Sequence, residues 1–290
     1  MIKEAKEMKG DLTVVWLDLA NAYGTVPHKL IETALEHYHI PEKIARIVRD
    51  YLERIHLRFR VGDYITSWQR LEKGIVTGCT ISVILFVMAM NLMIEAGKRE
   101  TRGPKTKADI RQPPGRGFMD DVTITTTTHI QARWVLGAME ETATWARMKF
   151  KPAKSRCLVI KKGKITQRFT LKIQGEQIPS IVNNPIKCLG KWYDDTLKDV
   201  NNSRRLERDT TEKLVNIDKT GLPGKFKAWI FQHGLLPRII WPLMLYDIAL
   251  TTVEGMERKK STITSVSGWE YHRASHQLDS TARQPSYVYH

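Results

Sequence analysis

Apolar and polar residues follow one another along this chain in blocks that predict strands first and helices next. Residues 12–19 form a run of β-branched, aliphatic and aromatic side chains, which predicts a strand buried on both faces. Pro27 precedes a helical pattern that extends to about His39. Pro41 begins a second predicted helix, whose apolar positions recur at helical spacing: Ile44, Ile47, Val48, Tyr51, Leu52 and Ile55.

The central part of the chain predicts two hairpins and two more helices. Residues 57–71 indicate a hairpin that turns at Gly62 and Asp63, and residues 80–96 form an apolar helical pattern. A loop rich in proline and glycine follows, and then residues 117–127 have strand-like composition around a turn at Asp120 and Asp121. Another amphipathic helix is marked by Ile130, Trp134, Ala138 and Trp145.

The last part of the chain changes from strands to helices. Residues 157–192 are rich in strand-forming side chains, and residues 201–260 have helical patterning. Residues 261–290 are polar and poor in aliphatic side chains, so we expect a disordered tail there. The order of strands, hairpins and helices predicts an α+β fold, in which helices back an antiparallel sheet.

Composition narrows the class of protein. The chain has 290 residues, 42% of them hydrophobic, and a formal net charge of +15, so it can form a packed core and favours an anionic partner. The three cysteines have no CxxC or Cys/His ligand spacing, which argues against a zinc site or a disulfide framework. The charged N-terminus is unlike a secretory signal, and no apolar run reaches the ~20 residues of a membrane span. We therefore expect an intracellular protein, nuclear or cytoplasmic, with no membrane partner.

Asp18 is the first residue whose chemistry departs from its surroundings. In an extended strand Val14, Trp16 and Asp18 point to one side, so a carboxylate stands at the end of an apolar row. Burying an ionised carboxylate is costly unless it is paired or holds a metal. Two interpretations stay open for this residue alone: a metal ligand, or a cap of the turn that ends the strand.

Asp120 and Asp121 form the second candidate. Adjacent carboxylates at a hairpin turn repel each other, and a cation would offset that repulsion, although Asp is also an ordinary turn residue. A strand-end carboxylate and a hairpin-tip pair can converge at one edge of an antiparallel sheet. Three carboxylates there can hold two Mg²⁺ ions about 4 Å apart, as phosphoryl transfer requires. The combination with Asp18 therefore predicts a two-ion site.

A block of positive charge lies further along the chain. Residues 147–172 contain no Asp or Glu, whereas a solvated face usually carries both signs. Such a block favours a phosphate backbone or a triphosphate as partner, with a solvated surface as the alternative. Its ten basic residues are Arg147, Lys149, Lys151, Lys154, Arg156, Lys161, Lys162, Lys164, Arg168 and Lys172.

Five motifs together resemble the ordered palm motifs of reverse transcriptases, especially those of non-LTR (LINE-like) retrotransposons. In chain order they are WLDLANAYGTVPHKLI, GIVTGCTISVILF, GFMDD, KFKPAKSRCLVI and IKCLGKWY. The resemblance covers about residues 10–193. It implies a polymerase palm in residues 1–195, a helical thumb in residues 196–260, and a tail in residues 261–290.

The resemblance implies a role for each matching residue. Asp18 and Asp120 would be the principal metal ligands, with Asp121 beside them and the carbonyl of Leu19 assisting. Tyr23 matches the aromatic residue that packs under the incoming sugar and rejects a 2′-hydroxyl, and a core aromatic residue is the alternative.

The later motifs imply the rest of the site. Gly78, at the start of a helix, would let the nucleotide and the template base approach the backbone, while Thr77 stands where the family usually has Gln. Lys154 matches a basic residue that could protonate the pyrophosphate leaving group, or it is one lysine of a basic run. Leu189 and Gly190 match the hairpin that holds the primer end.

The sequence thus predicts an RNA-directed DNA polymerase that uses two Mg²⁺ ions, with an RNA template, a DNA primer and dNTPs as partners. Because Asp18 lies only 17 residues after Met1, we expect the family's fingers segment to be largely missing. A catalytically inactive, retrotransposon-derived nucleic-acid-binding remnant is the alternative. A basic structural protein is a third possibility, but it leaves the order of the motifs unexplained.

Overall fold

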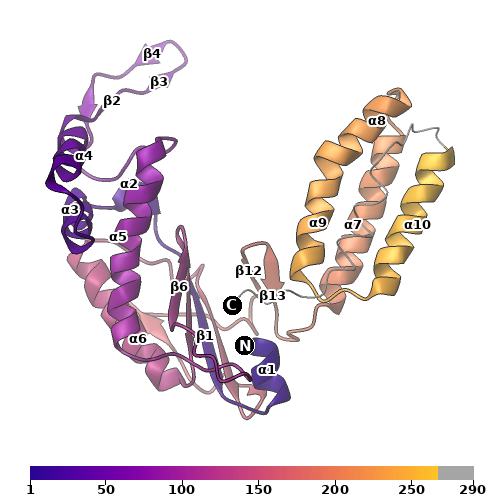
Figure 1. The fold of residues 1–290 in the computed structure, drawn as a ribbon, viewed down its shortest axis with the longest axis horizontal. Coiled ribbons are helices and arrows are strands. Elements are labelled where there is room, and N and C mark those ends of the chain that lie inside the picture. The colour runs from indigo at the N-terminus through magenta and orange to yellow at the C-terminus, as the bar shows by residue number, and fades with distance from the viewer. Residues whose placement is uncertain (267–290) are drawn as a thin grey trace. The chain divides into compact units, whose positions relative to one another are not determined.

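The structure is a computed structural model, and it describes residues 1–266 of the chain (Figure 1). The chain divides into two compact units, one of residues Met1–Ile186 and one that begins at Lys187. The sequence predicts the boundary between palm and thumb at residue 195. The observed division lies earlier, after Ile186, so the hairpin that precedes residue 195 belongs to the second unit. Each unit is described by itself.

A five-stranded antiparallel sheet forms the centre of the first unit, in the order β6-β7-β1-β8-β9. Its middle strand β1 is buried at all six positions, as its continuous apolar sequence predicts. Because a central strand covered on both faces has no solvent-facing side, it does not show the alternation of an amphipathic strand. The strands are β1 (Leu12–Leu17), β6 (Gly115–Phe118), β7 (Asp121–Thr126), β8 (Arg156–Lys161) and β9 (Lys164–Ile165).

Two long helices, α5 (Thr80–Arg99) and α6 (His129–Trp145), pack against each other and on one face of this sheet (Figure 1). They approach closely at Gly97, where an added Cβ would lie 2.9 Å from Cγ1 of Val135. The main core lies between these helices and the sheet face that carries Val15 and Leu17. The other helices of this unit are α1 (Ile2–Glu7), α2 (Ala22–Thr25), α3 (His28–His37) and α4 (Glu42–Arg54).

Helix α5 is long and apolar enough to cross a membrane, by length and composition alone. It extends beyond residue 96, where the predicted helix ends. In the fold it contacts α3, α6 and β6, and its side chains Leu85, Phe86 and Met93 are fully enclosed in the core. The side chains of Val83, Ile84 and Val87 on the same helix are exposed, so only part of its apolar surface is buried in the core.

The buried faces of α4 and α6 differ from those predicted. In α6 the side chains of Ile130, Trp134 and Trp145 are exposed, and the buried face is formed by Ala132, Val135, Leu136, Met139 and Ala143. In α4 the prediction is confirmed for Val48, Leu52 and the adjoining Ile55, which are buried, whereas Ile44 and Ile47 are exposed. Both helices carry apolar residues on more than one face, so periodicity alone does not determine which face packs against the rest of the fold.

Short hairpins complete the first unit. The predicted hairpin with its turn at Gly62 and Asp63 is present, formed by β2 (His56–Leu57), β3 (Arg60–Val61), β4 (Tyr64–Ile65) and β5 (Gln69–Arg70). A second ladder joins β10 (Lys172–Ile173) to β11 (Glu176–Gln177).

The second unit is helical apart from one hairpin, β12 (Ile186–Cys188) with β13 (Lys191–Tyr193), whose first strand begins at the boundary. Its helices are α7 (Val200–Asp218), α8 (Gly224–Ile230), the π-helix η1 (Phe231–Leu235), α9 (Leu236–Leu245) and α10 (Leu250–Val266). Phe231, Leu235 and Leu214 are buried together in its core.

The predicted disordered tail begins too early. Helix α10 continues beyond residue 261, because Ile263 packs against the core of the helical unit and Lys260 is buried with its ammonium 5.8 Å from the Phe231 ring centroid. These contacts stabilise a turn whose polar composition alone suggested disorder. The rest of that predicted tail, residues 267–290, lies outside the described residues.

The observed face of α6 gives a stability prediction. Leu136→Ala should lower the free energy of unfolding by about 2–5 kcal/mol, because it opens a cavity in the core. Trp134→Ala, on the exposed face, should change it by no more than about 0.5 kcal/mol. Urea unfolding followed by circular dichroism measures both values. A larger loss in Trp134→Ala than in Leu136→Ala would contradict the assignment of faces.

Candidate active site

Asp18 follows the last residue of β1 and is held by the loop that precedes β8. Its backbone N–H donates to Oγ of Ser155 at 3.1 Å, and its carbonyl accepts from the N–H of Lys151 at 2.8 Å. Strand alternation turns its side chain away from the face of Leu17, which contributes to the main core. Its Oδ2 is shielded from solvent and accepts no hydrogen bond from the described residues, and Nζ of Lys151 lies 4.0 Å from it.

Asp120 and Asp121 lie at the tight turn between β6 and β7, where Phe118 pairs with Asp121. Met119 takes the left-handed conformation that this turn requires, with φ at 57°. The last pair between β1 and β7 is Leu17 with Val122, so one further step in the register places Asp18 beside Asp121. The structure therefore brings residues 18 and 121 together across two neighbouring strands.

The charges of these residues interact. Burial raises the pKa of Asp121, and the negative charges of Asp120 and Asp18 raise it further. Burial also raises the pKa of Tyr23, with a further contribution from Asp120. The three carboxylates thus form one electrostatically coupled group, as the sequence predicts for their convergence.

This group suits a cation, although its side chains do not form a finished cage. No three His, Cys, Asp or Glu side chains among residues 1–266 are arranged as a metal site as they stand. Asp18 nevertheless offers a shielded carboxylate oxygen without a hydrogen bond, and carboxylate oxygens are the ligands that Mg²⁺ prefers. Asp18, Asp120 and Asp121 are therefore the residues that would hold such an ion, and the identity and number of ions remain predictions.

Tyr23 lies on α2 and stacks on Phe86 of α5, with ring centroids 4.4 Å apart and planes 8° from parallel. Its carbonyl accepts from the N–H of Ile75 at 2.9 Å. At Gly74, whose φ is +82°, an added Cβ would lie 2.8 Å from the carbonyl carbon of Gly24. This glycine contact, which sequence reasoning missed, holds the Tyr23 segment beside the irregular segment that leads to Thr77.

Thr77 and Gly78 are exposed at the entrance to α5. Gly78 has φ at +91°, a conformation that favours glycine, and an added Cβ would meet nothing within 4 Å. Backbone conformation rather than crowding within the chain therefore explains this glycine. The neighbouring thiol of Cys79 accepts a hydrogen bond from the Tyr51 hydroxyl at 3.2 Å.

Leu19 and Lys154 lie at opposite extremes of burial. The side chain of Leu19 is part of the main core, and its backbone forms an isolated bridge with Phe150. Lys154 is exposed in the turn before β8.

The lysine that faces Asp18 is Lys151, which sequence reasoning treated only as one member of the basic block. Its position directly after Phe150, the residue that bridges to Leu19, is recognisable only from the structure.

The basic block does not act as one uniform surface. Lys161 pairs with Asp11 at 2.7 Å, and Arg156 donates to the backbone carbonyl of Asn184 at 3.0 Å. Lys151 is directed to Asp18. The exposed members, which remain open to an anionic partner, are Arg147, Lys149, Lys154, Lys162, Lys164, Arg168 and Lys172.

Leu189 and Gly190 form the turn of the hairpin in the second unit, and both have positive φ, 48° and 87°. An added Cβ on Gly190 would collide with the indole of Trp241, so this turn packs directly on α9. Gly190 also lines a hollow of about 270 Å³ whose basic side chains outnumber its one acidic residue, Asp209. Those basic residues are Lys187, Arg205, Lys213 and Arg238.

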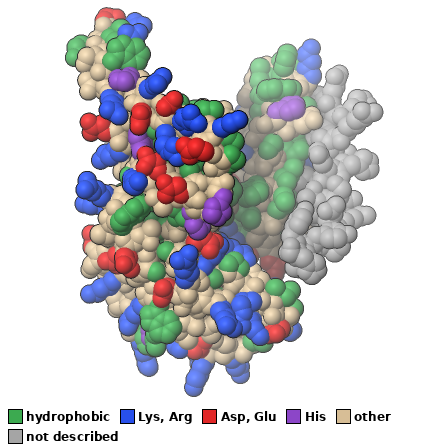
Figure 2. All heavy atoms as spheres, turned by 60° about the vertical axis from the view of Figure 1, so that its left-hand side comes forward, with side chains coloured by type: hydrophobic (Ala, Val, Ile, Leu, Met, Phe, Trp, Pro, Cys, Tyr) green, Lys and Arg blue, Asp and Glu red, His purple; other side chains and the backbone are tan. Residues whose placement is uncertain are grey.

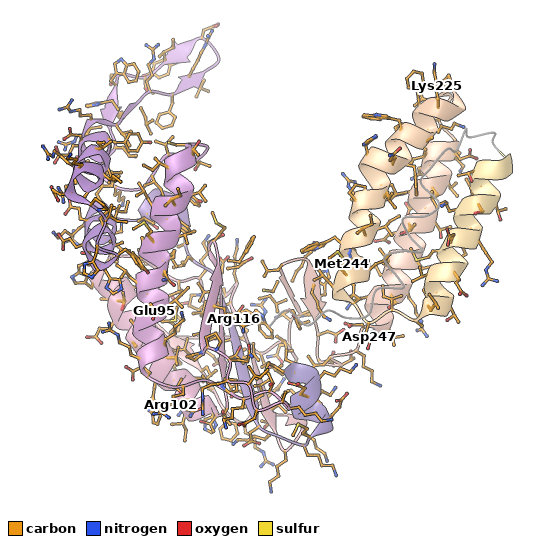
Figure 3. The ribbon with its side chains drawn as sticks, in the orientation of Figure 1. Glu95, Arg102, Arg116, Lys225, Met244 and Asp247 are labelled. Carbon is orange, nitrogen blue, oxygen red and sulfur yellow. The ribbon has the colours of Figure 1, made fainter. Side chains whose placement is uncertain are left out.

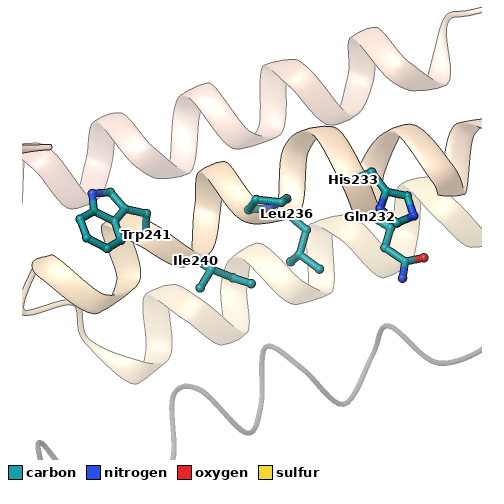
Figure 4. Close-up of a pocket in the computed structure, with 6 residues that line it drawn as sticks. Gln232, His233, Leu236, Ile240 and Trp241 are labelled. Atoms are coloured by element: carbon teal, nitrogen blue, oxygen red, sulfur yellow. The ribbon is translucent and has the colours of Figure 1, made fainter. Parts of the chain in front are cut away.

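A second hollow of the helical unit is apolar. It has a volume of about 400 Å³ and lies along η1 and α9, where Leu236, Ile240 and Trp241 line it together with His233 and Gln232 (Figure 4). It contains no acidic side chain, so its chemistry differs from that of the carboxylate group.

Comparison with known proteins agrees with this arrangement. Residues 2–193 match the family model described as reverse transcriptase (RNA-dependent DNA polymerase), so the chain belongs to the reverse transcriptase family. With the antiparallel sheet and its helices, this confirms the predicted α+β fold class.

Among solved structures, telomerase from Candida albicans in complex with a TWJ fragment of telomeric RNA is similar, with 8% sequence identity and a TM-score of 0.39. The match covers 97% of this chain and 49% of that chain, so this chain spans about half the length of that telomerase chain. Among curated proteins, none matches.

The carboxylate group gives a prediction for thermal and chemical unfolding. Mg²⁺ at ten times its dissociation constant should stabilise the parent chain by about 1.4 kcal/mol, because it binds only the folded state. Asp18→Asn and Asp121→Asn should lose most of this gain, whereas Asp50→Asn, on the exposed part of α4, should keep it. An equal gain in all four proteins would contradict a cation site here.

In the absence of divalent ions, the same carboxylate group should make the stability of the folded chain depend on pH. The raised pKa of Asp121 means that its ionisation disfavours folding, and this penalty is full above the raised pKa and disappears below the ordinary value of 3.8. The stability of the parent relative to Asp121→Asn should therefore increase as pH falls from 7 towards 4. Unfolding curves at successive pH values test this, and a relative decrease would contradict it.

The cysteines give a prediction for alkylation. Burial raises the pKa of Cys157 to about 11, whereas the hydrogen bonds from the Tyr51 hydroxyl and the backbone of Ile81 lower the pKa of Cys79. At pH 8 iodoacetamide should therefore modify Cys79 about 100-fold faster or more, as mass spectrometry of peptides would show. Tyr51→Phe should slow the labelling of Cys79. Equal rates for Cys79 and Cys157 in the folded chain would contradict the prediction.

Proposed function

We propose that this chain is an RNA-directed DNA polymerase domain that adds dNTPs to a primer 3′-hydroxyl on an RNA template. The observation that carries the proposal is the shielded Oδ2 of Asp18, without a hydrogen bond and beside Asp121 across β1 and β7, in a member of the reverse transcriptase family. That one oxygen has no hydrogen bond from the described residues, and a bound cation would satisfy it.

In the proposed reaction Asp18, Asp120 and Asp121 would hold two Mg²⁺ ions, and these would supply positive charge for the attacking and leaving oxygens. The β1–β7 register fixes the distance between two of these ligands before substrate arrives. Lys151 keeps a positive charge 4.0 Å from Asp18. Lys154, exposed in the same loop, is the proposed donor of a proton to pyrophosphate.

The proposed nucleotide site uses the entrance to α5. Tyr23 is held by its stack on Phe86, so its ring can act as a rigid surface under the sugar of the dNTP. Gly78 presents backbone without a side chain, which suits close approach of the nucleotide and the template base. Thr77 and the carbonyl of Leu19 are the remaining residues of the nucleotide site that the family resemblance implies.

The DNA primer is proposed to contact the hairpin at Leu189 and Gly190. The basic hollow that Gly190 lines supports this, because its cations suit a phosphate backbone. Under this proposal residues 1–195 are a palm and residues 196–260 a thumb, of the non-LTR retrotransposon type, in a chain with access to nucleic acid in the nucleus or cytoplasm.

A second candidate is a nucleic-acid-binding protein derived from a retrotransposon that no longer polymerises. It is favoured by one observation: among the described side chains the carboxylates do not already form a metal cage. Nζ of Lys151 lies 4.0 Å from Oδ2 of Asp18 and places a protein cation beside that carboxylate. Such a protein would bind nucleic acid through its basic surface but would not catalyse polymerisation.

Primer extension separates the two candidates. With Mg²⁺, a primed RNA template and dNTPs, the parent chain should extend the primer, and Asp120→Asn should reduce extension about 100-fold or more, because it removes a ligand where charge develops. Asp50→Asn is the matched control and should retain activity. Gel electrophoresis of a labelled primer measures the product. Absence of product from the parent, with binding intact, would favour the second candidate.

A further inference from the structure

The hairpin of residues 56–70 exposes five large apolar side chains: Phe59, Val61, Tyr64, Ile65 and Trp68. Figure 1 shows the hairpin extending beyond α4, and Figure 3 shows side chains standing out on both of its sides. A two-stranded ribbon by itself is marginally stable in water, since it buries little apolar surface. Exposed rings on such a ribbon therefore point to a partner that covers them.

Pairing assigns these side chains to two faces. Val61 lies opposite Tyr64, and Arg60 lies opposite Ile65. Directly opposite residues share a face, and alternation puts Phe59 on the face of Val61 and Tyr64. The exposed fractions of these three side chains are 59%, 74% and 70%, so neither ring is covered by the rest of the chain. The opposite face carries Arg58, Arg60 and Ile65, so a strand stacked on Phe59 and Tyr64 meets these long arginine side chains around the edge of the two-stranded ribbon.

The charge of the hairpin is positive and comes from arginine alone. Residues 56–70 contain Arg58, Arg60 and Arg70, no lysine and one acid, Asp63. Figure 2 shows basic side chains among the hydrophobic ones on this projecting tip.

One guanidinium already lies on an aromatic ring: the Cζ of Arg58 is 4.9 Å from the centroid of Trp68. A guanidinium stacked on a ring keeps its edge N–H donors free to bind phosphate. The hairpin therefore offers aromatic faces and phosphate donors within a few residues of each other, the combination that binds single strands.

We propose that this hairpin binds single-stranded nucleic acid, with bases stacked on Phe59 and Tyr64 and phosphates held by Arg58 and Arg60. Every base has a π-face, so we expect little sequence preference. A protein partner would account for the apolar side chains but not for three arginines with one acid. This inference rests on the proposed nucleic-acid function and adds a binding element separate from the three carboxylates.

Fluorescence anisotropy with a labelled 20-nucleotide oligouridylate tests the proposal on the full chain. The double variant Phe59→Ala/Tyr64→Ala should bind about tenfold more weakly or worse, because it removes two stacking surfaces. Arg58→Ala/Arg60→Ala should bind more weakly and lower the slope of log affinity against log salt by about 1.4, since two phosphate contacts are lost.

Two matched variants serve as controls. Trp134→Ala removes an exposed ring from α6, and Arg102→Ala removes an exposed guanidinium beyond the end of α5, where Figure 3 labels it. Both should bind like the parent chain. Circular dichroism and the unfolding midpoint should be unchanged in the hairpin variants, because the altered side chains are exposed. With saturating primed template, those variants should still extend the primer.

The outcomes are distinguishable. If the parent binds and the hairpin variants bind equally well, the hairpin proposal is wrong and the proposed nucleic-acid function stands. If the parent does not bind the oligonucleotide, both fall. If the hairpin variants keep full affinity but change the sedimentation of the chain, the hairpin is a contact between protein copies and the proposal is overturned.

Discussion

The hydrogen-bonded register of β1 is the constraint on which the rest of the first unit depends. It pairs with β7 on one side and β8 on the other, and all six of its residues are buried. A slip of one residue would turn Val15 and Leu17 away from the core and Asp18 towards it. The same ladder therefore specifies both the packing of the sheet and the position of the carboxylate beside Asp121.

That position carries an electrostatic cost within the fold. Oδ2 of Asp18 is shielded, and the pKa of Asp121 is raised by burial and further by the negative charges of Asp120 and Asp18. The loop before β8 offsets part of this cost, since its Ser155 and Lys151 bind the backbone of Asp18 and the Lys151 ammonium faces its carboxylate. Stability and charge concentration oppose each other at this edge of the sheet, and perturbed pKa values of this kind cluster at functional sites.

The positions of the helices and strands could be predicted from the sequence better than the helix faces that are buried. The continuous apolar run of β1 and the turn at Gly62 are local signals, and the convergence of Asp18 with Asp121 follows from antiparallel topology. The buried face of α6 could not be predicted, because Trp134 and Leu136 are both apolar and only the sheet decides between them. Lys151 was missed for a similar reason: its role depends on a bridge between Leu19 and Phe150 that no local pattern indicates.

The central place of β1 has a consequence for biosynthesis. Its six residues, LTVVWL, contain no charge and have high β propensity, while the strands that cover its two edges begin only at Asp121 and Arg156. At ribosomal speeds of about 5–20 residues per second, the nascent segment waits on the order of 5–20 s for its first partner. During that interval it is an uncovered, aggregation-prone strand. Slow translation or limited chaperone supply should therefore reduce the yield of soluble chain before any property of the folded state matters.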